Sequence, residues 1–337
     1  MMIKVLYKKI YILYNSTNNI QIDIQKGLKM FNYIDISYTK KVIQLLEHHK
    51  SSAKLADYLE VSRGSIVNWK EDDSKINDDN KLKIDVAYCE AFGLSSITAD
   101  EMNNVYDEIL KMDFSYFNSG EEALVQNISR VASFGSLEIE EKEITQKKFN
   151  RVVIDRELVK DLDQREFLSI KNLAVLNDKI IHDTLKGEID KISCKDIKNW
   201  HFMLMGGIRS DAGEYSAKYR IIPGSEELTL TDPRDVPEEL ERWVNRYSPI
   251  RTLKDIAEAH AHFELIHPFG DGNGRIGRLL MSIHAIQAGF IPPLIDKNNK
   301  ALYYVVLKHA QVHGEHSYLS YFIAQSILMM HRKFFRG

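Results

Sequence analysis

Twelve consecutive residues concentrate side chains that could do chemistry on a phosphate: His267-Pro268-Phe269-Gly270-Asp271-Gly272-Asn273-Gly274-Arg275-Ile276-Gly277-Arg278. Glycines allow positive φ and close backbone approach, and the free N–H groups of a helix start form an anion site. Arg275 and Arg278 would share one face of the first helical turn. Cations oppose the helix dipole there, so two arginines favour a polyanionic ligand, which Arg binds bidentately.

Asp271 and His267 supply the other two groups that such chemistry needs. A hard cation such as Mg²⁺ takes one or two carboxylates together with substrate phosphates, which suits Asp271. His267 has an imidazole that ionises near neutral pH, so it can take the proton of a hydroxyl nucleophile. The stretch therefore predicts transfer of part of a nucleotide to a hydroxyl, with metal and arginine stabilising the phosphate charge.

Each residue of the stretch also has an ordinary structural explanation. His267 could cap a helix, Asp271 and Asn273 could form a turn, and the arginines could simply be solvated. The combination at this spacing favours a site, although a Walker-type loop is excluded because no Lys-Ser or Lys-Thr pair follows the glycines. A zinc site is disfavoured too, because His260 and His262 are two residues apart and so lie on different helix faces.

Two helices must position this stretch. Residues 257–266 place Ala and large apolar residues at helical spacing. Downstream, apolar residues recur at steps of one, three and four: Leu279, Leu280, Ile283, Ile286 and Phe290. Gly289 suits a helix C-terminus. We expect a helix, a glycine-rich loop and a second helix that opens at about Gly274.

The stretch resembles the complete active-site motif of the Fic (Fic/Doc) family, His-Pro-Phe-x-Asp/Glu-Gly-Asn-Gly-Arg-x-x-Arg, with every defining position filled. The resemblance implies an all-α core with a small β-hairpin flap. It also implies transfer of AMP from ATP to a Ser, Thr or Tyr hydroxyl of a target protein, with release of pyrophosphate. Related Doc-type kinases depart from the pattern at Gly274, so adenylylation is favoured over phosphorylation.

The resemblance further implies a role for each residue. His267 would be the base, Asp271 the Mg²⁺ ligand, and Phe269 a core residue that fixes the loop. The residues implied to bind ATP are Gly272, Asn273, Gly274, Arg275, Arg278, Tyr303 and Tyr304. Among them, Asn273 and Arg275 would meet the α- and β-phosphates, and Arg278 the γ-phosphate. The two tyrosines would line the adenine pocket, although their own pattern favours plain helical core.

The segment from Ser136 to Thr145 has two explanations. Its residues by themselves indicate an acidic helix start, with Ser136 as the cap. The family resemblance implies an inhibitory helix with the pattern Ser/Thr-x-x-x-Glu-Gly/Asn, which Ser136 and Glu140 fill and Glu141 does not. Glu140 would then pair with Arg278 and exclude productive γ-phosphate placement. The same carboxylate could orient water to remove AMP from modified targets.

Residues 219–230 predict a β-hairpin around Pro223-Gly224-Ser225. Alone, this would be a surface hairpin. The resemblance implies that it is the flap on which the target protein docks by strand pairing. The family usually has Gly-x-Tyr/Phe-Arg just before it, and this chain has Ser216 at the Arg position.

Residues 51–70 resemble a helix-turn-helix unit of the phage-repressor type. The second helix would bury Ile66 and Trp69. Its outward residues are of types that contact DNA: Arg63, Ser65, Asn68 and Lys70. Glu60 replaces the usual turn glycine, and three acidic residues follow Lys70. A protein–protein or packing role therefore stays open beside DNA binding.

The composition is that of a globular protein with two or three domains: 337 residues, 44% hydrophobic, 28% charged and a net charge of −3. That charge argues against wholesale electrostatic binding of nucleic acid. We expect an N-terminal extension at 1–37, a helix-turn-helix-like domain at 38–117, a linker at 118–132 and a Fic-type domain at 133–330. Two cysteines far apart, no signal peptide and no membrane span predict a cytoplasmic protein. A homodimer stays open.

Two other functions compete with protein adenylylation. The chain could be a DNA-binding regulator whose Fic part only senses nucleotide, or a kinase on the same scaffold. The complete motif argues against the regulator, because a degenerate chain would be expected to have lost His267 or Asp271.

Overall fold

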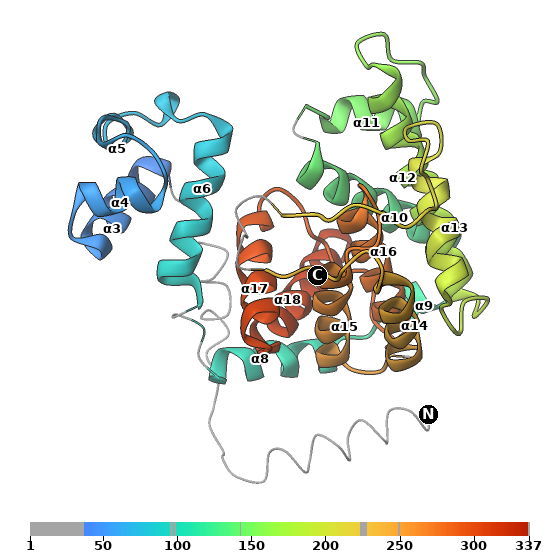
Figure 1. The fold of residues 1–337 in the computed structure, drawn as a ribbon. Helices are drawn as coiled ribbons and strands as arrows, with labels where there is room; N and C mark the ends of the chain where they lie inside the picture. The colour runs from blue at the N-terminus through green and yellow to red at the C-terminus, as the bar shows by residue number, and fades with distance from the viewer. Residues whose placement is uncertain are drawn as a thin grey trace.

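The computed structural model describes residues 37–94, 97, 99–141, 143–222, 228–248 and 250–335, and all the regular elements in these ranges are helices (Figure 1). The α-helices of the N-terminal part are α3 Tyr38–His49, α4 Ser52–Tyr58, α5 Arg63–Trp69, α6 Asp78–Tyr88, α8 Ala99–Lys111 and α9 Ser115–Asn118. The others are α10 Glu122–Glu140, α11 Gln146–Val153, α12 Gln164–Leu185, α13 Cys194–Met205, α14 Val236–Tyr247, α15 Leu253–Ile266, α16 Asn273–Gln287, α17 Lys300–His313 and α18 Ser317–Phe334. The all-α fold class is confirmed. None of these helices combines the length and apolarity that a membrane span requires.

Short polar side chains start many of these helices by accepting hydrogen bonds from free N–H groups. Ser51 caps α4, Thr145 caps α11 and Thr252 caps α15. Asp163 and Ser193 each form a reciprocal capping box, at the starts of α12 and α13. Each such cap stabilises its helix by about 1 kcal/mol, so the chain marks its helix boundaries locally.

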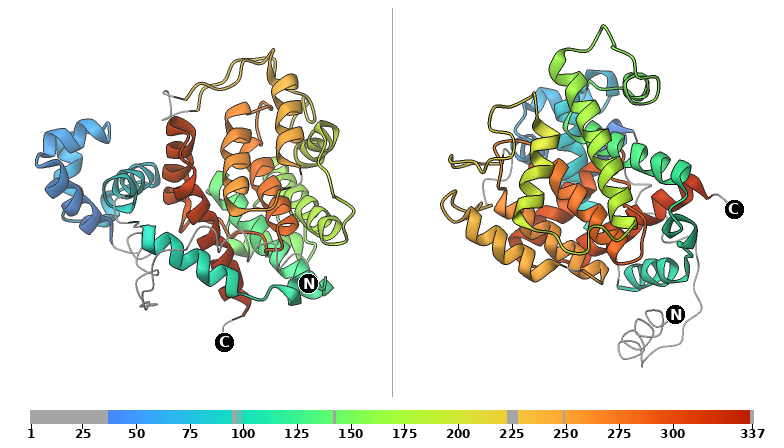
Figure 2. Two further views of the ribbon diagram at one scale, coloured as in Figure 1. Left: turned by 90° about the horizontal axis from the view of Figure 1, so that it is seen from below. Right: turned by 90° about the vertical axis from the view of Figure 1, so that its right-hand side faces the viewer.

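The described residues form two hydrophobic cores, and the division differs from the predicted one. The smaller core belongs to α3–α6 and ends at Tyr88. Val105 and Ile109 of α8 belong instead to the larger core, because α8 packs on α18. The N-terminal unit therefore ends before α8, rather than at the predicted boundary of 117. Figure 2 shows this unit standing to one side of the larger bundle.

Helices α4 and α5 lie where a helix-turn-helix pair was predicted. The side chain of Ser62 caps α5 by accepting from the N–H of Ser65 at 3.0 Å, and Ile66 and Trp69 are buried as predicted. Glu60 in the turn has φ +52°, the left-handed region that favours glycine. This geometry explains why such units usually carry glycine there, but DNA binding stays a prediction.

Helix α10 covers residues for which the sequence analysis predicted a linker and a helix start. The predicted linker 118–132 lies mostly inside α10, because Val125 and Ile128 are fully buried on a helix that packs along α12. One of the two explanations for the segment that begins at Ser136 made this residue the cap of a helix start, yet α10 continues through Ser136 and ends at Glu140. Apolar spacing upstream of Ser136 overrides the local capping pattern.

In the larger core, α15 and α16 pack on each other, α16 also contacts α12, and α15 contacts α17 and α18. The loop between α15 and α16 is therefore held among helices from distant parts of the chain.

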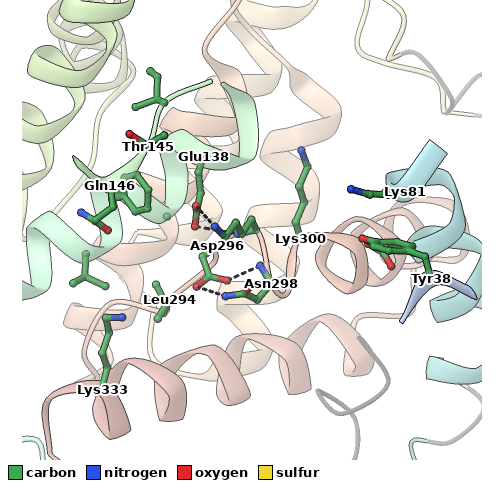
Figure 3. A pocket seen from close by; sticks show the side chains of 16 residues that line it. Tyr38, Lys81, Glu138, Thr145, Gln146, Leu294, Asp296, Asn298, Lys300 and Lys333 are labelled. Atoms are coloured by element: carbon green, nitrogen blue, oxygen red, sulfur yellow. Dashed lines mark hydrogen bonds and ion pairs between the residues drawn. The ribbon is translucent and has the colours of Figure 1, made fainter. Parts of the chain in front are cut away.

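A cavity of about 720 Å³ lies between the N-terminal unit and the larger core (Figure 3). Tyr38 and Lys81 line it from the N-terminal unit, and Glu138, Asp296 and Lys300 from the core. None of the lining residues belongs to the stretch 267–278, so this cavity is separate from the predicted site.

Candidate active site

The loop between α15 and α16 forms as the glycine pattern predicts. The N–H of His267 closes the last turn of α15 onto the carbonyl of Phe263 at 3.0 Å, and His267 itself has φ +49°. Gly272 has φ +82° and stands directly before α16, which begins at Asn273. The first turn of α16 therefore presents its free N–H groups next to the loop.

The side chain of Asn273 organises the loop. Its side-chain oxygen accepts from the N–H of Phe269 at 2.8 Å, and its amide nitrogen donates to the carbonyl of Phe269 at 2.8 Å. The residue is 2% exposed. Both ends of the Asn273 side-chain amide are therefore engaged with Phe269, and the implied phosphate contact of this residue stays a prediction.

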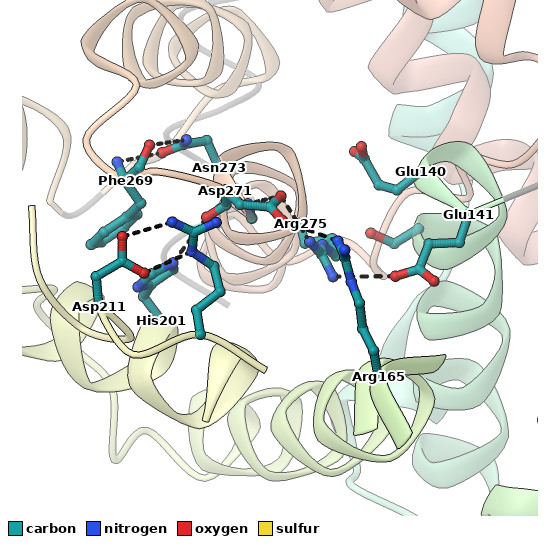
Figure 4. Close-up of polar contacts among 12 residues, drawn as sticks. Glu140, Glu141, Arg165, His201, Asp211, Phe269, Asp271, Asn273 and Arg275 are labelled. Carbon is teal, nitrogen blue, oxygen red and sulfur yellow. Dashed lines mark hydrogen bonds and ion pairs between the residues drawn. The ribbon is translucent and has the colours of Figure 1, made fainter. Parts of the chain in front are cut away.

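His201 on α13 supports the same loop, and the sequence analysis did not single it out. Its ring stacks on Phe269, with centroids 3.7 Å apart and planes at 4°. Nδ1 accepts from the N–H of Gly213 at 2.9 Å, and Nε2 donates to the carbonyl of Asp271 at 3.0 Å (Figure 4). Burial lowers the pKa of His201 to about 4, so the ring is neutral and this tautomer holds the loop.

Asp271 projects from the loop toward several arginines (Figure 4). One carboxylate oxygen accepts from the N–H of Gly272 at 2.7 Å and from Arg275 at 3.2 Å. The other lies 3.5 Å from Arg165 at the start of α12. Among the described residues, no three His, Cys, Asp or Glu side chains cluster to hold a metal ion. A cation at Asp271 would therefore depend on ligands from a substrate.

Arg278 is buried and holds the carboxylate of Glu140. Its Nη2 lies 2.8 Å from Oε1 of Glu140 and 3.0 Å from the carbonyl of Ser136, and its Nε donates to the Ser136 hydroxyl at 2.9 Å. Burial opposes ionisation of Glu140, yet the charge of Arg278 outweighs it and the pKa of Glu140 is lowered. This is the ion pair that the sequence predicts.

The Glu140 carboxylate lies over the N-terminus of α16. A Cβ on Gly274 would come within 2.8 Å of Glu140 Oε1 and 3.0 Å of Arg278 Nη1. An anionic group thus occupies the place where the free N–H groups and Arg278 meet. Glu141, next in the chain, lies 3.8 Å from Arg275. Both arginines of the motif face carboxylates from one end of α10.

His267 is a neutral imidazole whose Nε2 has no hydrogen-bond partner among the residues that the structure describes. Its Nδ1 donates to the carbonyl of Glu264 at 3.3 Å, which leaves the lone pair on Nε2. Burial, followed by the charge of Arg220, lowers the pKa of His267 to about 4. The pKa is thus lower than the near-neutral value that the sequence analysis assumes, and the ring is unprotonated at pH 7.

The comparisons with known proteins agree with this geometry. Residues 191–285 match the Fic/DOC family. Protein adenylyltransferase Fic of Drosophila melanogaster is 34% identical over 159 residues, which are 45% of this chain and 30% of that protein. The same-named protein of Drosophila virilis is 28% identical over 219 residues, 64% of this chain and 43% of that protein. The chain thus spans less than half the length of these relatives.

Solved structures of Fic proteins have the same fold. A fragment of Fic-1 from C. elegans aligns with a TM-score of 0.60 at 18% identity, covering 93% of this chain and 99% of the fragment. A Fic-domain signaling protein from Bacteroides thetaiotaomicron aligns with a TM-score of 0.55 at 15% identity, covering 69% of this chain and 96% of that chain. At such identities the likeness concerns the fold alone.

The segment before α14 lies against the loop between α15 and α16 and the end of α15. The N–H of Ser216 donates to the carbonyl of Pro268 at 2.9 Å, and Arg220 donates to the carbonyl of Phe269 at 2.6 Å. Further along the segment, the N–H of Thr231 donates to the carbonyl of Leu265 in the last turn of α15 at 3.1 Å. Residues 223–227, which hold the predicted turn, lie outside the described residues, and no strand is assigned to the described flanks.

Tyr303 and Tyr304 differ in what they could contact. Tyr303 is 1% exposed, and its hydroxyl lies 2.8 Å from Nε2 of His260. It is therefore core, which corrects the adenine contact implied for it. Tyr304 is half-buried, and the charges of Glu140 and Arg278 act on it. His260 is buried against Tyr303, which agrees with the expectation that it packs in the core.

Proposed function

We propose that this chain is a protein adenylyltransferase that moves AMP from ATP to a Ser, Thr or Tyr hydroxyl of a target protein. The observation that carries the proposal is the anion site at the start of α16. There Arg278 holds the carboxylate of Glu140, which lies against Gly274 in the first turn after the loop that follows His267. The names of the relatives matched along the Fic domain support the same activity.

The proposed reaction needs one base, and His267 supplies it. The hydroxyl oxygen of the target attacks the α-phosphorus of ATP and forms a phosphoester. The bond from that phosphorus to the oxygen bridging to the β-phosphate breaks, and pyrophosphate leaves. The hydroxyl proton goes to Nε2 of His267, which is free because Nδ1 already donates to the carbonyl of Glu264.

Asp271 suits Mg²⁺ as part of this proposal. Its carboxylate is partly exposed at the mouth of the loop, and a single carboxylate together with phosphate oxygens is a common donor set for Mg²⁺. A bound Mg²⁺ would neutralise phosphate charge. Arg275 and Arg165, both within 3.5 Å of Asp271, would then be able to turn toward phosphate oxygens.

We propose that Glu140 restrains this activity. Its carboxylate lies over Gly274 and pairs with Arg278. Without this pair, Arg278 would be available to hold the γ-phosphate. ATP can bind productively only when this carboxylate moves away or is removed. In modified targets the same carboxylate would orient a water molecule for removal of AMP.

Docking of the target on the segment 219–230 is part of the proposal. Arg220 of this segment donates to the carbonyl of Phe269 in the active loop, and Tyr219 and Ile221 are strongly exposed. An extended peptide that paired with it would pass close to His267.

The test uses ATP labelled in turn at the α- and γ-phosphates. Protein that retains only the α label supports adenylylation. Retention of only the γ label would indicate a kinase on the same scaffold and contradict the proposal. ATP binding without transfer of either label would leave a nucleotide-sensing module.

DNA binding by the N-terminal unit is a second proposal. Arg63 and Asn68 are exposed on α5, and Lys70 is exposed directly after its end. The measurement is affinity for duplex DNA across salt concentrations. An affinity that falls steeply as the salt concentration rises supports the proposal, because phosphate contacts release counterions. Lys70→Ala should bind DNA more weakly and with a shallower salt dependence, because it loses one such contact. Weak binding without salt dependence removes it.

A further inference from the structure

The carboxyl group of Glu264 is buried beside the active loop, and the reaction above uses only its backbone. The residue is 6% exposed, and within the described part of the chain its Oε1 has no hydrogen-bond partner. Buried polar side-chain atoms are nearly always hydrogen-bonded, and burying a carboxyl without a partner is costly. A group of this kind next to the base calls for a functional explanation.

Helix α16 makes room for this carboxyl at Gly277. A Cβ on Gly277 would lie 2.1 Å from Glu264 Oε1 and 3.2 Å from Cε1 of His260. No side chain fits there without displacing Glu264. Gly274, one turn earlier on α16, makes room for Glu140 in the same way. Two glycines of one motif thus each admit a carboxylate from a different helix.

Two oxygen atoms of Glu264 face Nδ1 of His267, one from the backbone and one from the side chain. Its backbone carbonyl accepts from Nδ1 at 3.3 Å, and its Oε2 lies 4.0 Å from the same nitrogen. A carboxylate at this edge of an imidazole stabilises the imidazolium that forms when the opposite nitrogen takes a proton. Burial strengthens that interaction, since little water screens it.

We propose that Glu264 is a positioning residue that acts through His267. It fixes the tautomer with Nδ1 protonated and stabilises the imidazolium formed when Nε2 takes the hydroxyl proton. The Nδ1 proton stays on the ring, and no proton moves to Glu264. This inference rests on the proposed adenylyl transfer and adds a residue outside the twelve-residue motif.

The charges around Glu264 make its effect depend on pH. His260 and His267 face it from α15, Arg278 from α16, Glu140 from α10, and Tyr303 and Tyr304 from α17. Burial raises the pKa of Glu264 to about 7, Arg278 opposes this rise, and Glu140 adds to it. Removal of Glu140 therefore favours the ionised form of Glu264. Release of the restraint and support of the base are thereby coupled.

The experiment compares Glu140→Gly with the double variant Glu140→Gly/Glu264→Gln, following kcat/KM for self-adenylylation from pH 5.5 to 8.5. We expect the parent rate to rise with pH through one ionisation at or below about 7. In the double variant this rise should be absent and the plateau at least about tenfold lower, with ATP affinity retained. Glu258→Gln is the matched control on the same helix, because Glu258 pairs with Arg246 at the surface. It should change neither the pH dependence nor the plateau of kcat/KM.

A folded double variant with the parental profile would overturn the inference, and so would a lower rate with an unchanged pH dependence. If glutamine prevents folding, Glu264→Asp keeps the charge and should keep the inflection with a lower plateau. Loss of the inflection in that variant would contradict the inference. If the Glu140→Gly parent binds ATP but transfers nothing, the proposed function fails instead.

Discussion

Glu140 and Arg278 form the contact on which the proposed regulation depends. Arg278 is 6% exposed, so its guanidinium needs an anionic partner at almost all times. In this structure Glu140 and the backbone and hydroxyl of Ser136 provide its partners. The γ-phosphate of ATP carries the same charge and could replace Glu140. The two anions therefore compete for one guanidinium.

Glu140→Gly should raise self- or target adenylylation severalfold, because Arg278 and the start of α16 become available to phosphate. The measurement is the initial rate of AMP incorporation from α-labelled ATP. Glu143→Gly, an exposed residue just beyond α10, is the matched control and should leave the rate unchanged. An unchanged rate in Glu140→Gly would contradict the restraint.

At the scale of elements, the last turn of α10 is held by the segment between α16 and α17. Lys300 donates to the carbonyl of Ile139 at 2.6 Å, and the backbone N–H of Lys297 donates to Glu138 at 3.2 Å. A Cβ on Gly135 would lie 2.5 Å from the carbonyl of Ile295, so the two segments touch at the backbone. This packing positions Glu140.

Lys300→Met should loosen that turn, because the carbonyl of Ile139 loses its donor while the aliphatic stem is kept. We expect faster amide hydrogen exchange in residues 137–141 and a rise in adenylylation smaller than that of Glu140→Gly. Lys308→Met, on the same helix α17, serves as the control. Unchanged exchange in Lys300→Met would show that the turn does not depend on this bond.

The turn between α4 and α5 gives a prediction about stability. Glu60 has φ +52°, which costs a residue with a Cβ about 1 kcal/mol that glycine avoids. Glu60→Gly should therefore raise the free energy of unfolding of the N-terminal unit by up to about 1 kcal/mol, measured by urea denaturation. The exposed Lys83 pair that it removes contributes little. Glu47→Gly, inside α3, should lower stability by about the same amount. Destabilisation by Glu60→Gly would contradict the account of the turn.

At the scale of the whole molecule, the buried His201, His260 and His284 and the partly buried His267 are expected to set the response to acid. Burial lowers their pKa values to about 4 for His201 and His267 and about 3 for His260 and His284. The unfolded chain binds these protons near pH 6.5 and the folded chain does not, so stability falls as the pH drops from 6.5 toward 4. Glu264 has a raised pKa, so the folded chain binds its proton more readily than the unfolded chain. Its protonation therefore offsets part of the loss of stability in acid.

Near pH 5 the unfolded chain should therefore bind about three more protons than the folded chain. The free energy of unfolding should then fall by about 4 kcal/mol for each unit by which the pH drops. The measurement is the urea midpoint at half-unit steps from pH 7.5 to 4.5. A midpoint that stays constant between pH 6.5 and 5 would contradict the burial of these rings.

The fold class and the loop were predictable because their signals are local. Glycine at 272 and the apolar spacing of residues 279–286 place a helix start within one residue of where it lies. The partners of that loop were not predictable. His201 is far from the loop in the sequence, and a single histidine in an apolar helix was its only signal. Asn273 matched a motif, but its two bonds to Phe269 appear only in three dimensions.

The central claim is transfer of an adenylyl group through His267, and intact-mass measurement of Glu140→Gly after incubation with Mg²⁺ and ATP tests it most directly. The account predicts a mass increase of one or more adenylyl groups, and no increase in Glu140→Gly/His267→Ala although that variant still binds ATP. A phosphoryl increment, or an adenylyl increment that persists without His267, would contradict it.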